Sequence, residues 1–128
     1  MSSTAKYDLE ERTAKFGEDT IDFIKTLPSS IITRQLTLQL IRSATSVGAN
    51  YCEADSAETR KDFTHKLGLC KKEAKETRHW LRMLARLLPD KKDEIRKLWV
   101  EADELQRIFI SIVRKTKENE QFGDSPRH

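Results

Sequence analysis

Glycine and proline are scarce in this sequence, with four glycines and three prolines among 128 residues. An all-β protein of this length needs many tight turns, and these two residues supply much of the backbone geometry that turns require. Charged residues, by contrast, make up 35% of the chain. This balance argues against a turn-rich β fold and favours long helices.

Long apolar runs are also missing. No stretch approaches the ~18 apolar residues of a membrane-spanning helix, and the N-terminal segment MSSTAKYDLEERTAKF lacks the apolar centre of a signal peptide. The two cysteines, Cys52 and Cys70, form no CxxC pair. We therefore expect a cytoplasmic chain without membrane contact, in which both cysteines are reduced, buried side chains.

Motifs of catalysis and metal binding are absent from the sequence. There is no glycine-rich phosphate loop, no GxSxG and no HExxH. Glu76 and His79 have the spacing used in di-iron bundles, but those sites need a second such pair and further inward carboxylates. Three histidines in the chain do not supply that set. We expect a protein that is not an enzyme, with no catalytic residue, metal ion or cofactor.

The sequence does contain a seven-residue repeat of core positions. Its members alternate three and four residues apart in three segments, a spacing typical of helices that pack in a left-handed bundle. They are Leu9, Thr13, Phe16, Thr20 and Phe23; Phe63, Leu67, Cys70, Ala74, Thr77, Leu81, Leu84 and Leu88; and Ile95, Leu98, Ala102, Leu105, Phe109 and Ile112. The pattern predicts an all-α fold.

Capping and helix-breaking residues divide the chain into four helices. Pro28 ends the first helix, and the two serines after it can cap the second. The segment 55–59 (DSAET) offers caps for the third helix, and Pro89 ends that helix before the fourth begins. Because the connections are short, we predict an antiparallel up-down four-helix bundle, left-handed. Its domain spans residues 1–118, with helices at about 7–26, 30–54, 59–88 and 91–117, and a disordered tail follows at 119–128.

The second predicted helix has an unusual centre, RSATSVGANYCEA (42–54), which is rich in small and polar residues. Ser43 and Asn50 fall on its core face, where a buried polar group without a hydrogen bond costs about 1–3 kcal/mol. We interpret both as buried polar residues that fix helix register.

A strip of small residues, Ala44, Gly48 and Cys52, runs beside that core face. Glycine inside a helix costs about 1 kcal/mol relative to alanine, and dense packing against another backbone can offset this cost. The close neighbour is either a helix of the same chain or another subunit.

The third predicted helix carries apolar residues beyond its core stripe. They are Leu69, Trp80, Met83 and Leu87, on a face centred about 100° from the core. A tryptophan-centred apolar strip is typical of a subunit interface. We expect a homo-oligomer interface there, joined by Ala44 and Gly48. The alternative is a widened core stripe within one chain.

Positive charge is concentrated on this third helix. Residues 60–86 hold nine Lys or Arg and three acidic residues, whereas the whole chain has a net charge of only +3. Five cations form a stripe about 120° from the core face: Lys71, Lys75, Arg78, Arg82 and Arg86. Like charges four residues apart repel each other, so this cationic stripe indicates an anionic partner such as RNA or DNA.

Two plainer interpretations of the cationic stripe remain open. It is either a solvated face or the neighbour of the acidic first helix. No aromatic residue is interleaved in the stripe, so base stacking is not expected and any nucleic-acid binding should tolerate different sequences.

Residues 39–84 resemble the four-helix-bundle proteins named after the intervening sequences of bacterial 23S rRNA genes. The family pattern has Arg-Ser, then Ser-(Ile/Val)-x-Ala-Asn and an acidic residue, then a Phe-led helix with Lys-Glu-Ala-x-Glu-Thr and an aromatic-Leu pair. The matching residues are Arg42, Ser43, Ser46, Val47, Ala49, Asn50 and Glu53, then Phe63, Lys72, Glu73, Ala74, Glu76, Thr77, Trp80 and Leu81. The chain departs at Ala54, where the family often has glycine.

The resemblance implies bundles that assemble into five-fold rings. It also implies a relation to the accessory proteins of diversity-generating retroelements, which work with a reverse transcriptase and RNA through a basic surface. For most of the family no biochemical activity is established. We therefore expect a homo-oligomer, a pentamer by resemblance, whose basic surface binds RNA or other nucleic acid without strong sequence preference. The alternative is a protein-protein scaffold with no nucleic-acid role; a reverse transcriptase or another protein is a further candidate partner.

Overall fold

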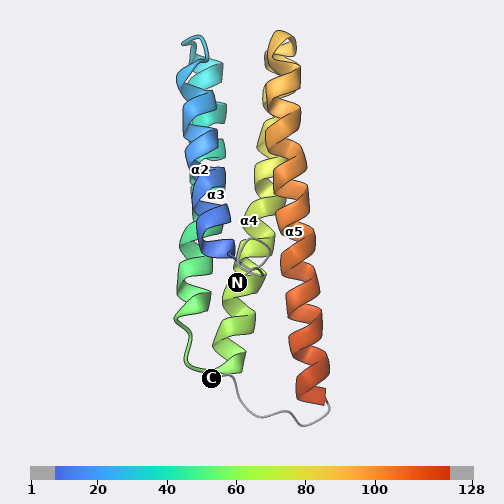
Figure 1. Ribbon diagram of the computed structural model, residues 1–128. Coiled ribbons are helices and arrows are strands. Elements are labelled where there is room, and N and C mark those ends of the chain that lie inside the picture. The colour runs from blue at the N-terminus through green and yellow to red at the C-terminus, as the bar shows by residue number, and fades with distance from the viewer. Residues whose placement is uncertain (1–7, 122–128) are drawn as a thin grey trace.

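The computed structural model describes residues 8–121, and every long element in that range is an α-helix (Figure 1). The residues 1–7 and 122–128 lie outside this range. The helices are α2 (Leu9–Lys25), α3 (Ile31–Asp55), α4 (Arg60–Leu87) and α5 (Lys92–Gln121), and a single 3-10 turn, η1 (Pro89–Lys91), precedes α5. The prediction of an all-α four-helix bundle is confirmed.

Three of the helices begin at a side-chain cap. Asp8 accepts a hydrogen bond from the backbone N–H of Glu11 at 3.1 Å, Ser30 from that of Thr33 at 3.0 Å, and Thr59 from that of Asp62 at 3.0 Å. Each contact satisfies one of the free N–H groups in a first helical turn. Two of these caps, Ser30 and Thr59, come from the segments that the sequence singled out.

The helix ends differ from expectation mainly at the C-terminus. The last helix continues to Gln121, so residues 119–121 of the expected tail are helical. The remainder of that tail, and the start of the first helix at residue 7, lie outside the described residues.

The seven-residue repeat forms the core. All of its members apart from three are buried. The exceptions are half-buried and pack on the rim of the same cluster: Phe63, Leu88 and Ile112. Phe63 and Ile112 lie towards the end of the bundle that α2 does not reach. With 17 residues, α2 is shorter than its neighbours, and only α3, α4 and α5 continue past its first turn (Figure 1).

The helices form a closed cycle in which α2 is diagonal to α4. Packing is most extensive between α3 and α4 and between α4 and α5, whereas α2 packs well on α3 and sparsely on α5. Successive helices are antiparallel, as the chain path shows (Figure 1); the left-handed crossing stays a prediction. The acidic first helix therefore does not lie beside the cationic stripe of α4, and that alternative interpretation of the stripe was wrong. The neighbour is α5.

The strip of small residues on α3 packs against α2 of the same chain. Ala44 is fully buried. A Cβ atom placed on Gly48 would lie 3.3 Å from Thr13 Oγ1 and 3.4 Å from the Thr13 carbonyl oxygen. The two helix backbones thus approach so closely that a side chain at position 48 would push α2 away, and this close contact offsets the conformational cost of glycine.

Cys52, one turn further along the strip, is exposed, so the expectation that both cysteines are buried was wrong for this one. It borders Glu10 and Glu11 in the first turn of α2, where the covering helix begins. Cys70 is buried, its thiol donates a weak hydrogen bond to the Val47 carbonyl at 3.6 Å, and burial raises the pKa of Cys70 to about 12. Both cysteines are free.

The two predicted polar core residues of α3 behave differently. Ser43 is buried, and its hydroxyl lies 2.9 Å from the hydroxyl of Thr77 on α4. Thr77 also lies 2.8 Å from the Glu73 carbonyl, so its single hydrogen serves one acceptor at a time. Asn50 is half-buried and donates to the Ser46 carbonyl of its own helix at 2.9 Å. Of the two, Ser43 makes a contact that can set the register of α3 on α4.

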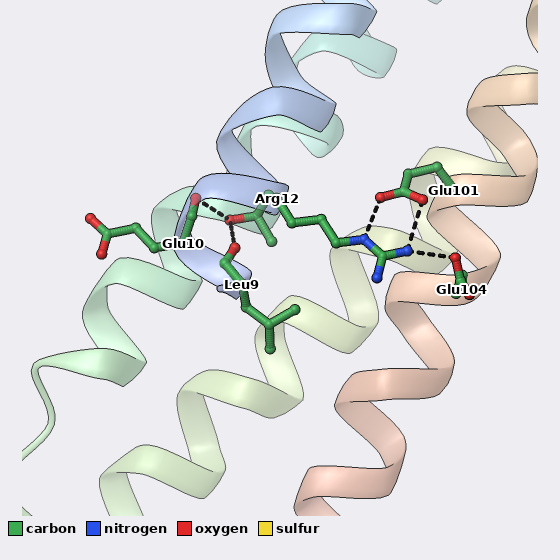
Figure 2. Close-up of polar contacts among 6 residues, drawn as sticks. Leu9, Glu10, Arg12, Glu101 and Glu104 are labelled. Carbon is green, nitrogen blue, oxygen red and sulfur yellow. Dashed lines mark hydrogen bonds and ion pairs between the residues drawn. The ribbon is translucent and has the colours of Figure 1, made fainter. Parts of the chain in front are cut away.

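An ion-pair clamp joins α2 to α5 (Figure 2). The guanidinium of Arg12 donates from Nε to Glu101 Oε2 at 2.7 Å and from Nη2 to Glu101 Oε1 at 2.9 Å, and Nη2 also reaches Glu104 Oε1 at 2.5 Å. These bonds raise the pKa of Arg12 further above its ordinary value, with Glu101 as the largest cause. A bidentate pair of this kind is directional, and it holds the ends of the cycle together where apolar packing is sparse.

The surroundings of two glycines give two predictions of opposite sign. Gly68→Ala should raise the free energy of unfolding by about 1 kcal/mol, because nothing lies within 4 Å of the added Cβ. Gly48→Val should lower it by about 1–3 kcal/mol, because the side chain meets the backbone of Thr13. Urea unfolding followed by helical circular dichroism, at one protein concentration, measures both. Equal stabilisation by the two substitutions would contradict the close α2–α3 contact.

The clamp gives a second prediction. Arg12→Met keeps the aliphatic stem but removes the ion pairs, and should lower the free energy of unfolding by about 1 kcal/mol. Amide hydrogen exchange should accelerate in α2 more than in α4. Lys15→Met, which removes an exposed pair with Asp19 within α2, is the control and should change stability by less than about 0.5 kcal/mol. Identical exchange in the Arg12→Met protein and the parent would show that the clamp does not stabilise α2.

Candidate nucleic-acid interface

All five cations of the predicted stripe lie on the flank of α4 that faces α5 or the solvent beside it. Lys75, Arg82 and Arg86 are exposed, whereas Lys71 and Arg78 are half-buried. The difference follows from helix phase, because Lys71 and Arg78 are one heptad apart and point most directly at the neighbouring helix. The stripe is therefore the edge of a groove between two helices.

Arg78 is the best-anchored member of the stripe. Its Nη1 lies 3.5 Å from Asp103 Oδ1, it donates a short hydrogen bond to the Gln106 side-chain oxygen, and its guanidinium carbon lies 5.3 Å from the centre of the Trp99 ring. All three partners are on α5. Asp103 is shared, since it also pairs with Arg107 at 3.0 Å. Arg78 thus joins α4 to α5 and contacts the indole.

Helix α5 adds cations of its own to this groove. Towards the η1 end, Arg82 faces Lys92 and Arg96 across a hollow of about 540 Å³. The rim carries those three cations and one acid, Asp93. The floor is apolar and consists of Leu81, Ala85, Ile95 and Trp99. We call this the Trp99 hollow.

A second hollow lies further along the same groove, beyond the Arg78 bridge. It has a volume of about 310 Å³ and an apolar floor formed by Ile110 and Val113. Its charged residues are Lys71, Arg114, Lys117 and Glu118. Cations from both helices therefore line the groove on either side of Arg78, and we call this whole surface the α4–α5 face.

The sequence did not predict Trp99 as part of this surface. The indole is 36% exposed and lies beside the stripe, so the statement that no aromatic residue accompanies the cations holds for α4 alone and was wrong for the surface. The sequence does indicate that Trp99 lies at the edge of the buried stripe, because it directly follows the core residue Leu98 and lies one turn beyond Ile95. Only the pairing of α4 with α5 brings it to Arg78.

The predicted interface residues of α4 lie on the other flank. Trp80 follows Arg78 by two residues, which rotates it by about 200° around the helix axis. Lys66, two heptads before Trp80, pairs with Glu53 of α3 at 2.6 Å, so this flank faces α3. The strip Leu69, Trp80, Met83 and Leu87 is half-buried within the single chain. Trp80 and Leu87 pack against the core, as the alternative of a widened core stripe expects. The ring of His79 meets that of Trp80 edge-on, with 4.8 Å between the ring centres.

Ala44 and Gly48 are not on the same flank as this strip. Their contacts are with the core and with Thr13 of α2. The structure therefore does not bring them together with Leu69, Trp80, Met83 and Leu87. More fully exposed apolar side chains occur on α3, namely Ile31, Ile32 and Leu38 at 70%, 58% and 64%.

A buried carboxylate oxygen distinguishes the α3–α4 flank. Oε1 of Glu73 is inaccessible to solvent and has no hydrogen-bond partner. Burial raises the pKa of Glu73 above its ordinary value, the Glu76 carboxylate adds to the shift, and Arg42 and Lys72 oppose it. Removing an acceptor from water without a partner is unfavourable, so this atom marks a place where a further donor would be stabilising.

Among residues 8–121, no three His, Cys, Asp or Glu side chains gather as a metal-ion site would require. No helix within the same residues is long and apolar enough to cross a membrane.

Comparison with known proteins identifies the fold family. A family model described as 23S rRNA-intervening sequence protein matches residues 5–111. A solved protein of unknown function from the S23 ribosomal protein family of Bacteroides thetaiotaomicron has a similar fold, with a TM-score of 0.72 and 29% sequence identity. That similarity covers 81% of this chain and 96% of the other. The same comparison with curated proteins found no match. On the extent of the family match, this chain belongs to the 23S rRNA-intervening sequence protein family.

Proposed function

We propose that this protein is a non-enzymatic, cytoplasmic homo-oligomer, a pentameric ring by its family resemblance, that binds RNA or other nucleic acid through the α4–α5 face. The observation that carries this proposal is the meeting of two sets of cations. The stripe of α4 lies across one groove from Lys92, Arg96, Arg114 and Lys117 of α5. Basic residues gathered on one face are the electrostatic signature of phosphate binding.

The accessible cations favour binding that tolerates different sequences. Lys75, Arg82 and Arg86 are exposed, and no ion pair within the described residues engages them. Contacts of this kind to phosphates position a nucleic acid but carry no sequence information. In a ring, several such faces would act on one strand and raise the overall avidity.

The oligomer interface is proposed on the opposite flank of α4, where Trp80 and its apolar neighbours lie. The two flanks are separate, so assembly would leave the α4–α5 face free. The half-buried state of the strip limits the apolar area that assembly can cover, so the contact would be partly polar.

The alternative function is a protein-protein scaffold, with a reverse transcriptase or another protein as partner. The contacts of Arg78 favour it, because this cation is already engaged by an ion pair with Asp103 and a hydrogen bond to Gln106. Under that alternative the α4–α5 face would have little affinity for phosphate.

A salt titration tests nucleic-acid binding. A fluorescently labelled, unstructured RNA should bind at about 50 mM salt and weaken by orders of magnitude by about 200 mM. Arg82→Glu/Arg86→Glu should reduce affinity at low salt at least tenfold and make the dependence on salt shallower, since each lost phosphate contact lowers the slope by about 0.7–0.9. Fluorescence anisotropy measures both quantities.

Arg34→Glu is the control for this titration. Arg34 is an exposed cation on α3, away from the α4–α5 face. Its substitution lowers the net charge, by half as much as the double variant does. Its effect should be less than threefold. If RNA and DNA fail to bind at about 50 mM salt, the result contradicts nucleic-acid binding and favours the protein-protein scaffold.

Sizing measurements test the proposed interface. Trp80→Asp should convert the oligomer to a smaller species, but Trp80 also packs on the core, so loss of folding would imitate this result. Leu69→Glu is the cleaner variant, because Leu69 lies outside the group of side chains that pack on the core cluster. Light scattering should give a smaller mass with unchanged helical circular dichroism. An unchanged mass in both variants would reject the interface.

A further inference from the structure

We propose that the Trp99 hollow binds an unpaired nucleobase, so that the α4–α5 face prefers single-stranded over double-stranded nucleic acid. This inference rests on the proposed function and specifies its ligand. It follows from the juxtaposition of Trp99, the three cations Arg82, Lys92 and Arg96, and the apolar floor that they surround.

The shape and lining of the hollow fit a base with its attached phosphate. Its volume of about 540 Å³ lies in the range of small-molecule sites. The floor of Leu81, Ala85, Ile95 and Trp99 offers apolar contact to a planar ring. The cations stand at the rim, where the phosphates on either side of an inserted base would lie.

The Trp99 indole contacts a cation that is itself anchored to α5. The Arg78 guanidinium lies over the Trp99 ring, and Asp103 and Gln106 hold that guanidinium in place. An aromatic ring restrained in this way loses little conformational freedom when a base contacts its exposed part. The nearby positive charge also attracts the phosphates of the same nucleotide.

Selection for single strands follows from base accessibility. In a duplex the bases are paired and stacked on each other, so a tryptophan at the surface of the protein cannot reach their faces. Single-strand binding proteins combine a cationic groove with aromatic side chains on which bases stack, irrespective of sequence. The α4–α5 face has both features, whereas the hollow beside Lys71 has cations and an apolar floor but no aromatic residue.

The charge on the rim favours a nucleic acid over a second copy of this chain as the occupant. Three of the four charged rim residues are cationic. A second copy would have to bring an acidic, apolar surface into the hollow, and its presence would exclude quenchers from Trp99. Quenching by acrylamide therefore distinguishes the two occupants.

The experiment compares the parent protein with Trp99→Leu and Trp99→Phe, using three probes. The probes are an unstructured oligo(U), an RNA duplex of equal length and inorganic polyphosphate, which has charge but no base. Oligo(U), but not polyphosphate, should quench the tryptophan emission of the parent. In Trp99→Phe the quenching should largely disappear while binding persists, because phenylalanine also stacks and Trp80 is the only remaining tryptophan.

Affinity measurements complete the test. Trp99→Leu should weaken oligo(U) binding about tenfold, leave duplex and polyphosphate binding within twofold, and keep the salt slope unchanged, since the cations are intact. Unaltered oligo(U) affinity in Trp99→Leu, equal affinity of the parent for duplex and single strand, or a Trp99 that acrylamide cannot quench in the free protein would overturn the inference. In each of these cases phosphate binding can still hold. Failure of all three probes to bind at about 50 mM salt would instead remove the proposed function and this inference with it.

Discussion

The structure depends on α4 packing between α3 and α5 at the same time. One stripe of α4 closes the core, and each flank meets a different helix. On one side Ser43 and Thr77 bring two hydroxyls together, and Cys70 bonds to the backbone of α3. On the other side Arg78 bonds to α5. Because these contacts occur at several levels along α4, a sliding or rotation of this helix would break all of them together.

The first helix has a lesser share in this arrangement and is held by different forces. It is short, diagonal to α4 and only sparsely packed on α5. Two features compensate for the sparse packing of α2. Gly48 allows α2 to approach α3 closely, and Arg12 forms ion pairs with Glu101 and Glu104 of α5. Apolar packing thus dominates on one side of α2, and charge-assisted hydrogen bonds on the other.

The separation of the two flanks of α4 has a functional consequence. Cations face α5 and an apolar strip faces α3, so the two proposed surfaces do not compete for the same side chains. Family membership is consistent with this division but leaves the activity open, because the solved relative is itself described as a protein of unknown function. The cations and the indole beside them are therefore the features that support the proposed function.

The sequence by itself determined the number of helices, most of their boundaries and the buried stripe of three of them, because helical periodicity, caps and helix breakers act over a few neighbouring residues. It also located the cationic stripe of α4. It did not determine which helix covers which face, since periodicity shows that a face is buried and not what buries it. The exposure of Cys52, the acidic first helix lying away from the stripe, and Trp99 beside Arg78 all follow from that choice. Only the tertiary structure decided it, because residues 21 positions apart meet through the packing of two whole helices.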